Sequence, residues 1–268
     1  MPALAHRTDF LALISVSRAN PNGDPLHGGK PRTDRAGCGI ISPVCIKRKL
    51  RDRLSEMGAE ILITPPCVSG DSLAQRAAQL KPGCDYIRRA CERWYDVRAF
   101  GQVFAFPGAH YPGVKGPVTL QEAFSLHPIR LCREGITRCI GYSDDAHGGS
   151  NIGFRQFVEY GLYALRGSVS AYAAAKTGFS EEDCELLRLA LLHMFDNDSS
   201  SARPAGSMAV KRLFWWKHSG MLGEYPPDRV FGTVNAELKC SGLPLSFGDY
   251  RIIHTPLPGL EPTIYGED

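Results

Sequence analysis

The sequence lacks the patterns that mark zinc-binding proteins and disulfide-stabilised secreted proteins. It has nine cysteines among 268 residues, with no C-x-x-C pair and no histidine at zinc-finger spacing. An odd number of cysteines cannot pair completely within one chain, and a chain of this length can bury a hydrophobic core without disulfides. We therefore expect reduced thiols, and we predict neither a metal nor another cofactor.

Membrane-directing segments are also missing. Residues 1–20 show no basic start followed by an uninterrupted apolar run and a small-residue cleavage site. No later segment is long and apolar enough to span a bilayer. These absences predict a cytoplasmic protein without a membrane partner.

An excess of charge of one sign is missing as well. The chain has 31 Lys and Arg residues against 28 Asp and Glu residues, which gives a formal net charge of +3 at pH 7. Bulk charge therefore cannot establish nucleic-acid binding. Any such function must be argued from the way in which the basic residues are grouped along the chain.

No internal repeat and no low-complexity linker divides the chain, so we predict one α+β domain over residues 1–268, with insertions. The clearest helix is at residues 42–58, where Ser42 suits the N-cap, Pro43 the first turn and Gly58 the end. Composition and periodicity predict strands at 9–17, 59–64, 95–106, 207–218 and 229–238, helices at 72–80, 83–94 and 179–195, and a tail from Leu243 that wraps the surface.

A polar, glycine-containing tip lies between two strand-like segments within residues 136–160, a pattern that is typical of a protruding β-hairpin. A second polar segment, the loop at residues 17–39, joins the first strand to the helix at 42–58. Its lysine, Lys30, follows two glycines as in a P-loop, but Pro31 stands where that motif needs Ser or Thr. The loop can still present its backbone N–H groups and three cations to an anionic ligand: Arg18, Lys30 and Arg32.

Several short motifs occur in an order and spacing that resemble a known family. They are "NPNGDP" at 20–25, Pro31 with Arg32, "VCIKRKL" at 44–50, "DVRAFG" at 96–101, "GVKGPV" at 113–118, "ITR" at 136–138, "YGLY" at 160–163, residues 190–195 and "SMAVKRLFWWKH" at 207–218. Together they resemble the repeated backbone subunit of type I-C CRISPR–Cas Cascade effector complexes, a family of the RAMP superfamily. The resemblance spans at least the first four-fifths of the chain.

The resemblance implies an RNA-recognition-motif-like (ferredoxin-like) palm with a hairpin thumb at about residues 132–160. It implies a subunit without enzymatic activity, several copies of which assemble side by side along one guide RNA (crRNA). The guide bases stay free to pair with target DNA. Further partners are the other Cascade subunits, namely the processing or cap subunit, the large subunit and the small subunit.

A protein that leaves guide bases free should hold phosphates and sugars, which basic, polar and aromatic side chains can do. The candidate RNA-binding residues are Arg18, Asn20, Lys30 and Arg32 in the loop, Lys47, Arg48 and Arg51 on the first helix, Arg98 in an apolar strand, Arg138, Phe154 and Arg155 in the hairpin, and Ser207, Met208, Lys211 and Arg212 near the strand at 207–218.

These groups have structural alternatives. The helix cations also suit a solvated helix face, and Arg98 could form a salt bridge with Asp96. In the hairpin, Phe154 and Phe157 could contact the next subunit instead of wedging between bases. Trp215 and Trp216 point to opposite sides of a strand, and we expect both to pack in the interior.

Two competing functions are left open by the sequence. Asp24 and Asp34 could cut RNA with a metal, as a loop aspartate does in type III relatives of this family, although turn formation explains both residues. A hydrolase could use Cys139 and His147, but these residues stand in no recognisable catalytic arrangement.

Overall fold

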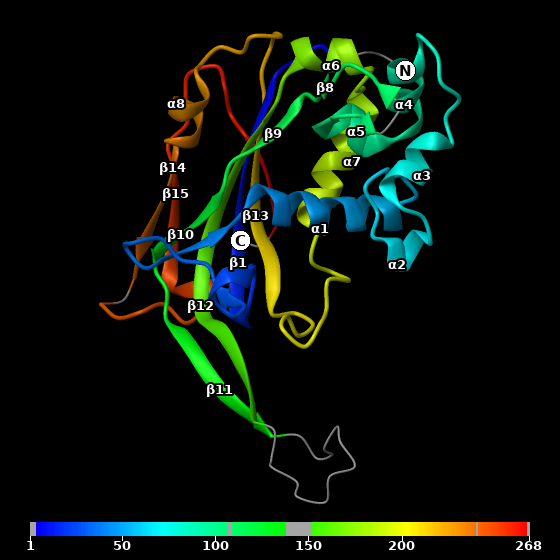
Figure 1. Cartoon of the computed structure of the whole chain (residues 1–268). Helices are drawn as coiled ribbons and strands as arrows, with labels where there is room; N and C mark the ends of the chain where they lie inside the picture. The colour runs from blue at the N-terminus through cyan, green and yellow to red at the C-terminus, as the bar shows by residue number, and fades with distance from the viewer. Residues whose placement is uncertain (1–3, 107–108, 138–151, 240, 267–268) are drawn as a thin grey trace, which may run out of the picture.

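The fold is given by a computed structural model, which describes residues 4–106, 109–137, 152–239 and 241–266 (Figure 1). Its main feature is a large antiparallel sheet in which the strands follow the order β16-β13-β1-β12-β10-β4, while β9 and β11 also pair with β12. These strands are β1 (Thr8–Ala19), β4 (Cys38–Ile41), β9 (Val118–Leu120), β10 (Ala123–Pro128), β11 (Leu131–Thr137), β12 (Ile152–Val169), β13 (Met208–Lys217) and β16 (Thr263–Gly266).

The central strand β1 is buried on both faces, which explains its nearly continuous apolar sequence. Phe10 and Ile14 belong to one hydrophobic cluster, whereas Leu11 packs in a second cluster on the opposite face. Trp215 and Trp216 on β13 divide between the same two clusters and are both buried. The predicted strand at 9–17 and the packing role of the two tryptophans are therefore confirmed.

Helices cover the first face of the sheet. They are α1 (Pro43–Glu56), α5 (Tyr95–Phe100), α6 (Ala171–Thr177) and α7 (Glu181–Leu192). Ser42 caps α1 by accepting a hydrogen bond from the Cys45 N–H group, and Gly58 follows the helix end with φ of 90°. Ser180 and Asp183 form a capping box at the start of α7. Both helices were predicted from these capping residues, and both are confirmed.

Beside α1, shorter elements enclose a small hydrophobic cluster of their own around Tyr86, Trp94 and Phe104. They are α2 (Pro66–Ser69), α3 (Leu73–Ala78), α4 (Tyr86–Arg93), β5 (Gly101–Gln102), β6 (Ala105–Phe106), β7 (Ala109–His110) and β8 (Val114–Lys115). The second face of the sheet is covered by α8 (Pro227–Phe231), β14 (Val234–Leu238) and β15 (Tyr250–His254).

Four sequence predictions differ from the structure. Residues 95–106 form α5 and two short strands instead of one strand. Residues 229–238 divide between the end of α8 and β14 instead of forming one strand. Residues 59–64 form no strand, because the backbone N–H groups of Leu62 and Ile63 donate to the Asp96 carboxylate instead of to a neighbouring strand. The tail from Leu243 contributes β15, which pairs with β14, and β16, which pairs with β13 at the edge of the main sheet.

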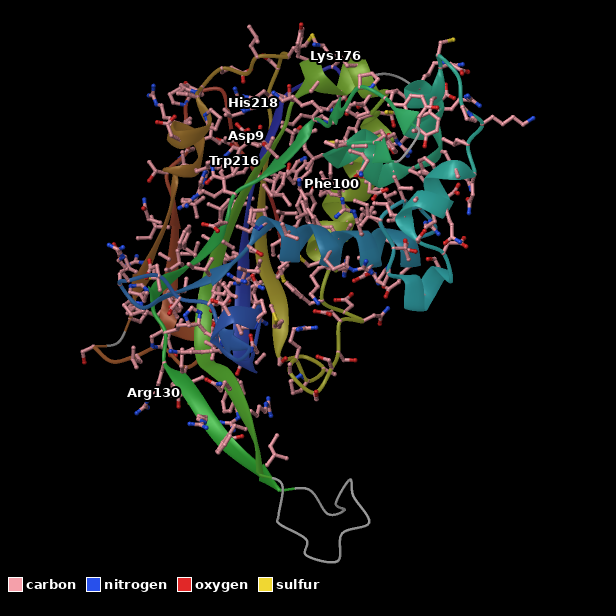
Figure 2. The ribbon with its side chains drawn as sticks, in the orientation of Figure 1. Asp9, Phe100, Arg130, Lys176, Trp216 and His218 are labelled. Atoms are coloured by element: carbon pink, nitrogen blue, oxygen red, sulfur yellow. The ribbon has the colours of Figure 1, made fainter. Side chains whose placement is uncertain are left out.

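Two features lie at opposite ends of the sheet. At one end, the buried side chains of Asp9 and His218 lie 2.9 Å apart from carboxylate oxygen to Nε2, and Figure 2 shows Trp216 beside them. At the other end, β11 and the first part of β12 form an antiparallel ribbon that projects from the sheet, with Arg130 at its base (Figures 1 and 2). The tip that joins these strands lies outside the described residues. Within the described part of the chain, no helix is long and apolar enough to cross a membrane.

Candidate functional site

A groove at the base of the projecting ribbon brings together three segments that are far apart in the sequence. It encloses a cavity of about 250 Å³, and we call it the hairpin-base groove. The end of β1 closes one side, because the Asn20 N–H group donates to the Ala202 carbonyl at 2.9 Å and Ser17 N–H donates to the Ser207 carbonyl at 2.8 Å. Its lining residues are Asn20, Gly28, Gly29, Ile136, Phe154, Arg155, Gln156, Ser201 and Ala202.

Two arginines are held beside this groove by an aromatic ring. The guanidinium carbons of Arg18 and Arg155 each lie 4.9 Å from the centre of the Phe157 ring, which is 1% exposed. Arg155 also donates to the Arg18 carbonyl at 2.6 Å, while Arg18 is paired with Glu134 of β11 at 2.8 Å. Because Phe157 is buried under the two cations, the predicted wedging of Phe157 between bases is wrong.

The backbone at Arg18 is strained. Its φ is 50°, and it is the one non-glycine residue with positive φ among those that the structure describes. A left-handed conformation in a residue with a side chain costs free energy, and such positions cluster at functional sites. Here the conformation presents the Arg18 carbonyl to Arg155, so the strain couples the end of β1 to the ribbon.

Several polar atoms at the groove have no hydrogen-bond partner within the described part of the chain. Asn20 donates from Nδ2 to the Gly29 carbonyl at 2.6 Å, which fixes the amide orientation and leaves its Oδ1 atom unpartnered. The Nε atom of Arg155 and the Oγ atom of Ser207 are also buried and unpartnered. Because buried polar groups are normally hydrogen-bonded, this set of atoms calls for water or a polar ligand.

An exposed aromatic side chain completes the groove. The Phe154 ring is 56% exposed, and the Arg133 guanidinium lies 3.7 Å from its centre. An accessible ring beside cations can stack against a nucleobase while the cations attract phosphate. The sequence analysis identified Phe154 and Arg155 but missed Arg133 and Glu134. The ribbon register, which pairs Glu134 with Arg155, is the signal that would have found them.

The loop carboxylates form turns. Asp34 accepts hydrogen bonds from the N–H groups of Ala36 and Cys38 at 2.9 and 2.8 Å. Asp24 accepts from Leu26 N–H and lies 2.7 Å from His27 Nδ1, and the hydrogen bond from His27 is the largest cause that lowers the Asp24 pKa. No cluster of three or more metal-ligating side chains was found among the described residues. These contacts favour the turn-forming interpretation of both aspartates.

Other loop cations lie nearby on the same segment. Lys30 is exposed, and Arg32 lies 3.5 Å from the Asp24 carboxylate. Lys30 lies on β3 (Lys30–Pro31), which pairs with β2 (Gly23–Asp24) across η1 (Pro25–His27), and Arg32 directly follows β3. Their assignment to a ligand stays a prediction.

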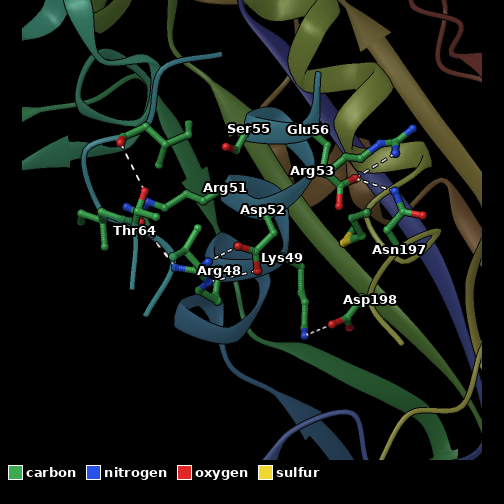
Figure 3. Close-up of a pocket in the computed structure, with 14 residues that line it drawn as sticks. Arg48, Lys49, Arg51, Asp52, Arg53, Ser55, Glu56, Thr64, Asn197 and Asp198 are labelled. Carbon is green, nitrogen blue, oxygen red and sulfur yellow. Dashed lines mark hydrogen bonds and ion pairs between the residues drawn. The ribbon is translucent and has the colours of Figure 1, made fainter. Parts of the chain in front are cut away.

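On α1, the three predicted cations do not share one open face. Arg51 is buried, and its Nε atom donates to the Asp96 carboxylate at 2.9 Å. Arg48 is paired with Asp52 (Figure 3). Lys47 lies 5.3 Å from the centre of the Phe100 ring, and partial burial, followed by the charge of Arg51, lowers its pKa. The prediction that Arg51 faces a ligand is wrong, because its charge is neutralised inside the protein.

Arg98 also differs from its prediction. It lies on α5 instead of on a strand, and it donates two hydrogen bonds to the Asp183 carboxylate at 2.7 and 2.9 Å. Its predicted partner Asp96 is bound to Arg51. This bidentate geometry ties α5 to the start of α7, so Arg98 has a structural role that the sequence spacing did not reveal.

The residues around β13 separate in space. Met208 is buried in the first hydrophobic cluster, so its predicted position against a ligand is wrong for the chain as described. Lys211 lies at the point where the register of the pairing between β13 and β1 shifts. The Arg212 guanidinium lies 5.8 Å from the ring centre of Phe247, which follows β14. Ser207 accepts a hydrogen bond from Ser17 N–H near the end of β1, but it does not line the hairpin-base groove. Arg138, Cys139 and His147 lie outside the described residues.

Comparison with known proteins gives this fold a class. The chain resembles a chain of a solved structure described as "CRISPR RNA-guided surveillance complex, pre-nicking", with a TM-score of 0.56 and 15% identity over 78% of each chain. A second structure, a "CRISPR RNA-guided surveillance complex", aligns with a TM-score of 0.48 and 17% identity over 78% of this chain and 68% of that one. The first of these two similarities shows that the chain shares its fold with a chain of that complex.

A family model described as "CRISPR-associated protein Cas7" matches residues 6–255. The chain therefore belongs to the Cas7 family. A relative from Haloferax volcanii, "CRISPR-associated protein Cas7", is 25% identical over 230 residues, which cover 75% of this chain and 67% of the relative. The family resemblance drawn from the sequence motifs is confirmed, and the type I-C subtype stays a prediction.

Proposed function

We propose that this Cas7 family member is a non-catalytic backbone subunit that binds guide RNA in a type I-C CRISPR interference complex in the cytoplasm. In this proposal the sheet with its helices is the RNA-recognition-motif-like palm, and the β11–β12 ribbon is the thumb. Copies bind side by side on one guide, whose bases pair with target DNA. Processing or cap, large and small subunits complete the complex.

The observation that carries the proposal is the chemistry of the hairpin-base groove. Arg133 lies against the exposed ring of Phe154, and Arg18 and Arg155 lie on the Phe157 ring; all three are cations that suit phosphate oxygens. The unpartnered Oδ1 atom of Asn20 can accept a hydrogen bond but cannot bind a phosphate, which is itself an acceptor. A ribose hydroxyl next to a phosphate supplies both a donor and an acceptor, so a sugar–phosphate backbone matches the groove.

The binding should be electrostatic and independent of sequence. Replacing both Arg18 and Arg155 with Ala should reduce the amount of RNA that copurifies with the assembled protein, for every guide sequence. It should also flatten the salt dependence of binding by about 0.7 in log–log slope for each lost phosphate contact. Arg88→Ala is the matched control, because Arg88 is an exposed arginine of α4, far from the ribbon in Figure 1.

Filter binding at a series of salt concentrations measures both quantities. Equal RNA retention in the double variant and in native protein would remove the groove from the RNA site. Native protein that copurifies without RNA would refute the proposed function itself.

RNA cleavage through Asp34 or Asp24 is the competing function. The turn hydrogen bonds of both carboxylates supply a structural reason for their presence in the loop. We therefore expect no products when the assembled complex is incubated with labelled complementary RNA and magnesium. Fragments at regular spacing that disappear in Asp34→Ala would establish the nuclease instead.

A further inference from the structure

Arg166 on β12 is a partly buried arginine whose charge is not neutralised within the described part of the chain. Its guanidinium makes no hydrogen bond, ion pair or cation–π contact there. Every other described arginine that is at least partly buried is held by a carboxylate, a backbone carbonyl or an aromatic ring, as Arg98 is by Asp183 and Arg155 by Phe157. Because partly buried polar groups are normally paired, Arg166 is available to a ligand.

Arg166 lines a cavity of about 320 Å³ between the main sheet and α8, which we call the α8 cavity. On the sheet side, Gln121 follows β9, and its N–H group donates to the Arg166 carbonyl at 2.9 Å. On the opposite side, α8 contributes Asp228 and Phe231, and β14 contributes Asn235. Phe231 is buried, whereas Gln121, Asp228 and Asn235 are exposed. The cavity therefore has an apolar inner surface and a polar rim.

The two charged residues of the α8 cavity are not paired with each other. Within the described part of the chain, the Asp228 carboxylate accepts no hydrogen bond and forms no ion pair, with Arg166 or with any other cation. A ligand that carries both a carboxylate and a cationic group can bind the two together. Asn235 donates to the Gly232 carbonyl at 3.5 Å, so its Oδ1 atom can accept from the ligand, and the Gln121 amide can both donate and accept. Donors and acceptors of this kind match the backbone of a peptide.

The same features make other ligands unsuitable. Arg166 is the one cation among the residues that line the cavity, and a phosphate backbone would bring repeated negative charge next to Asp228 without a group to pair with it. The cavity also lies near the end of the sheet away from the β11–β12 ribbon (Figure 1), and Arg166 follows Arg155 on β12 by roughly 35 Å of strand. A small molecule is normally enclosed by its site, whereas the polar rim here is exposed.

We propose that the α8 cavity binds a segment of a different protein subunit, in which an acidic side chain pairs with Arg166 and a basic side chain pairs with Asp228. The inference rests on the proposed function, in which other subunits complete the interference complex. An exposed rim suits this occupant, because a protein partner makes further contacts outside the cavity and does not depend on being enclosed by it.

Arg166→Glu tests the contact in the complex assembled with its guide RNA and the other subunits. It replaces an attraction by a repulsion, so the amount of one other subunit per copy of this chain should fall by about 10-fold or more. Quantitative mass spectrometry of the purified complex measures this ratio. Arg251→Glu is the matched control, because Arg251 is an exposed arginine of β15 outside the cavity, and it should keep the native ratio. Thermal unfolding of the isolated protein should differ little between the two variants.

Cross-linking identifies the occupant. A photo-reactive p-benzoylphenylalanine in place of Asn235 should cross-link to a segment of the lost subunit that contains neighbouring acidic and basic residues. The same group in place of Arg88 on α4 is the control and should not reach that segment. Changing the acidic residue of the cross-linked segment to Lys should restore its binding to the Arg166→Glu variant, because the two charges are then exchanged.

Equal amounts of every other subunit in the Arg166→Glu and native complexes would overturn the inference. A cross-link to RNA, to DNA or to another copy of this chain would overturn it as well, and so would the absence of a cross-link. The Arg166→Glu variant should keep the native amount of RNA, because Arg166 does not line the hairpin-base groove. Native protein that copurifies without RNA would instead refute the proposed function.

Discussion

Arg51 of α1 and Arg155 of the hairpin-base groove have opposite kinds of neighbours. Arg51 of α1 is bound to the buried carboxylate of Asp96, and Arg48 is bound to Asp52. In the groove, Arg155 lies on the Phe157 ring and donates to a backbone carbonyl, and among the described residues no carboxylate pairs with it. A ring and a carbonyl orient a guanidinium without cancelling its charge. The comparison teaches that the density of basic residues along a sequence does not reveal which of them can reach a ligand.

The largest expected effect comes from breaking the buried pair on α1. Asp96→Asn leaves the Arg51 guanidinium buried without a counter-charge, and removing one partner of such a pair costs about 3–5 kcal/mol. Urea denaturation should show this loss in the free energy of unfolding. Asp52→Asn is the control, because the Arg48–Asp52 pair is partly exposed and should cost less than about 1 kcal/mol. Equal losses in both variants would contradict the distinction between the two pairs.

A second carboxylate that stabilises the fold is that of Glu224, in the turn after β13. Its contribution to the free energy of unfolding depends on pH. Hydrogen bonds lower the Glu224 pKa from 4.5 to about 2. The largest cause is the bond from the Ser219 hydroxyl, and bonds from Ser219 N–H and His218 add to it. Because the folded-state pKa lies below the unfolded one, this stabilisation is complete above pH 4.5 and is lost as the pH falls toward 2.

Glu224→Gln should therefore unfold more easily than native protein at pH 7, and the difference between the two should shrink below pH 4.5. Thermal unfolding monitored by circular dichroism over that range measures it. Asp9 is a second acid-sensitive group. Burial by itself raises the Asp9 pKa, but hydrogen bonds outweigh burial and lower the pKa overall, and the strongest of these bonds comes from His218. The variant should accordingly keep some acid sensitivity. A difference that stays constant across the range would contradict the assigned role of Glu224.

Among the described residues, Glu134 is the one carboxylate that pairs with Arg18 or Arg155, and removing its charge should strengthen RNA binding. Glu134 is paired with Arg18 and is partly exposed, so it competes with a phosphate for the same guanidinium. Glu134→Gln should tighten RNA binding by about 1.4- to 5-fold, which corresponds to the roughly 0.2–1 kcal/mol of an exposed pair. Glu159→Gln makes the same charge change on β12, where Glu159 faces Arg130. An equal gain in both variants would show only a general charge effect.

The smallest expected effect is that of the α1 surface on RNA binding. Arg48→Ala should leave the salt dependence of RNA binding unchanged, because Asp52 already neutralises this guanidinium. The same filter-binding measurement as for the groove variants applies. A slope that falls by about 0.7 would return α1 to the RNA site.

Much of the fold could be predicted from local signals. The capping residues Ser42 and Ser180 predicted α1 and α7, and the apolar run around Phe10 predicted β1. The segment around Arg98 could not be predicted, because its alternating apolar residues fit a strand as well as a helix. Its helical conformation depends on partners more than eighty residues away, such as Asp183.

The candidate site was predicted in part. Asn20, Phe154 and Arg155 line one groove, and Arg18 binds Arg155 through its carbonyl, whereas Arg51, Arg98 and Met208 turn inward. Side-chain type and spacing identify cations but not their counter-charges. Those counter-charges come from other elements of the fold, which the sequence does not place.

The sequence by itself determined the family, the two main helices and the central strand, because capping hydrogen bonds and hydrophobic periodicity act over a few neighbouring residues. Only the tertiary structure decided which cations are neutralised, and that Arg155 of the ribbon binds the carbonyl of Arg18 at the end of β1. The physical reason is the separation along the chain between the residues that interact. Charge pairing and burial depend on contacts between segments that the antiparallel sheet brings together from distant parts of the chain.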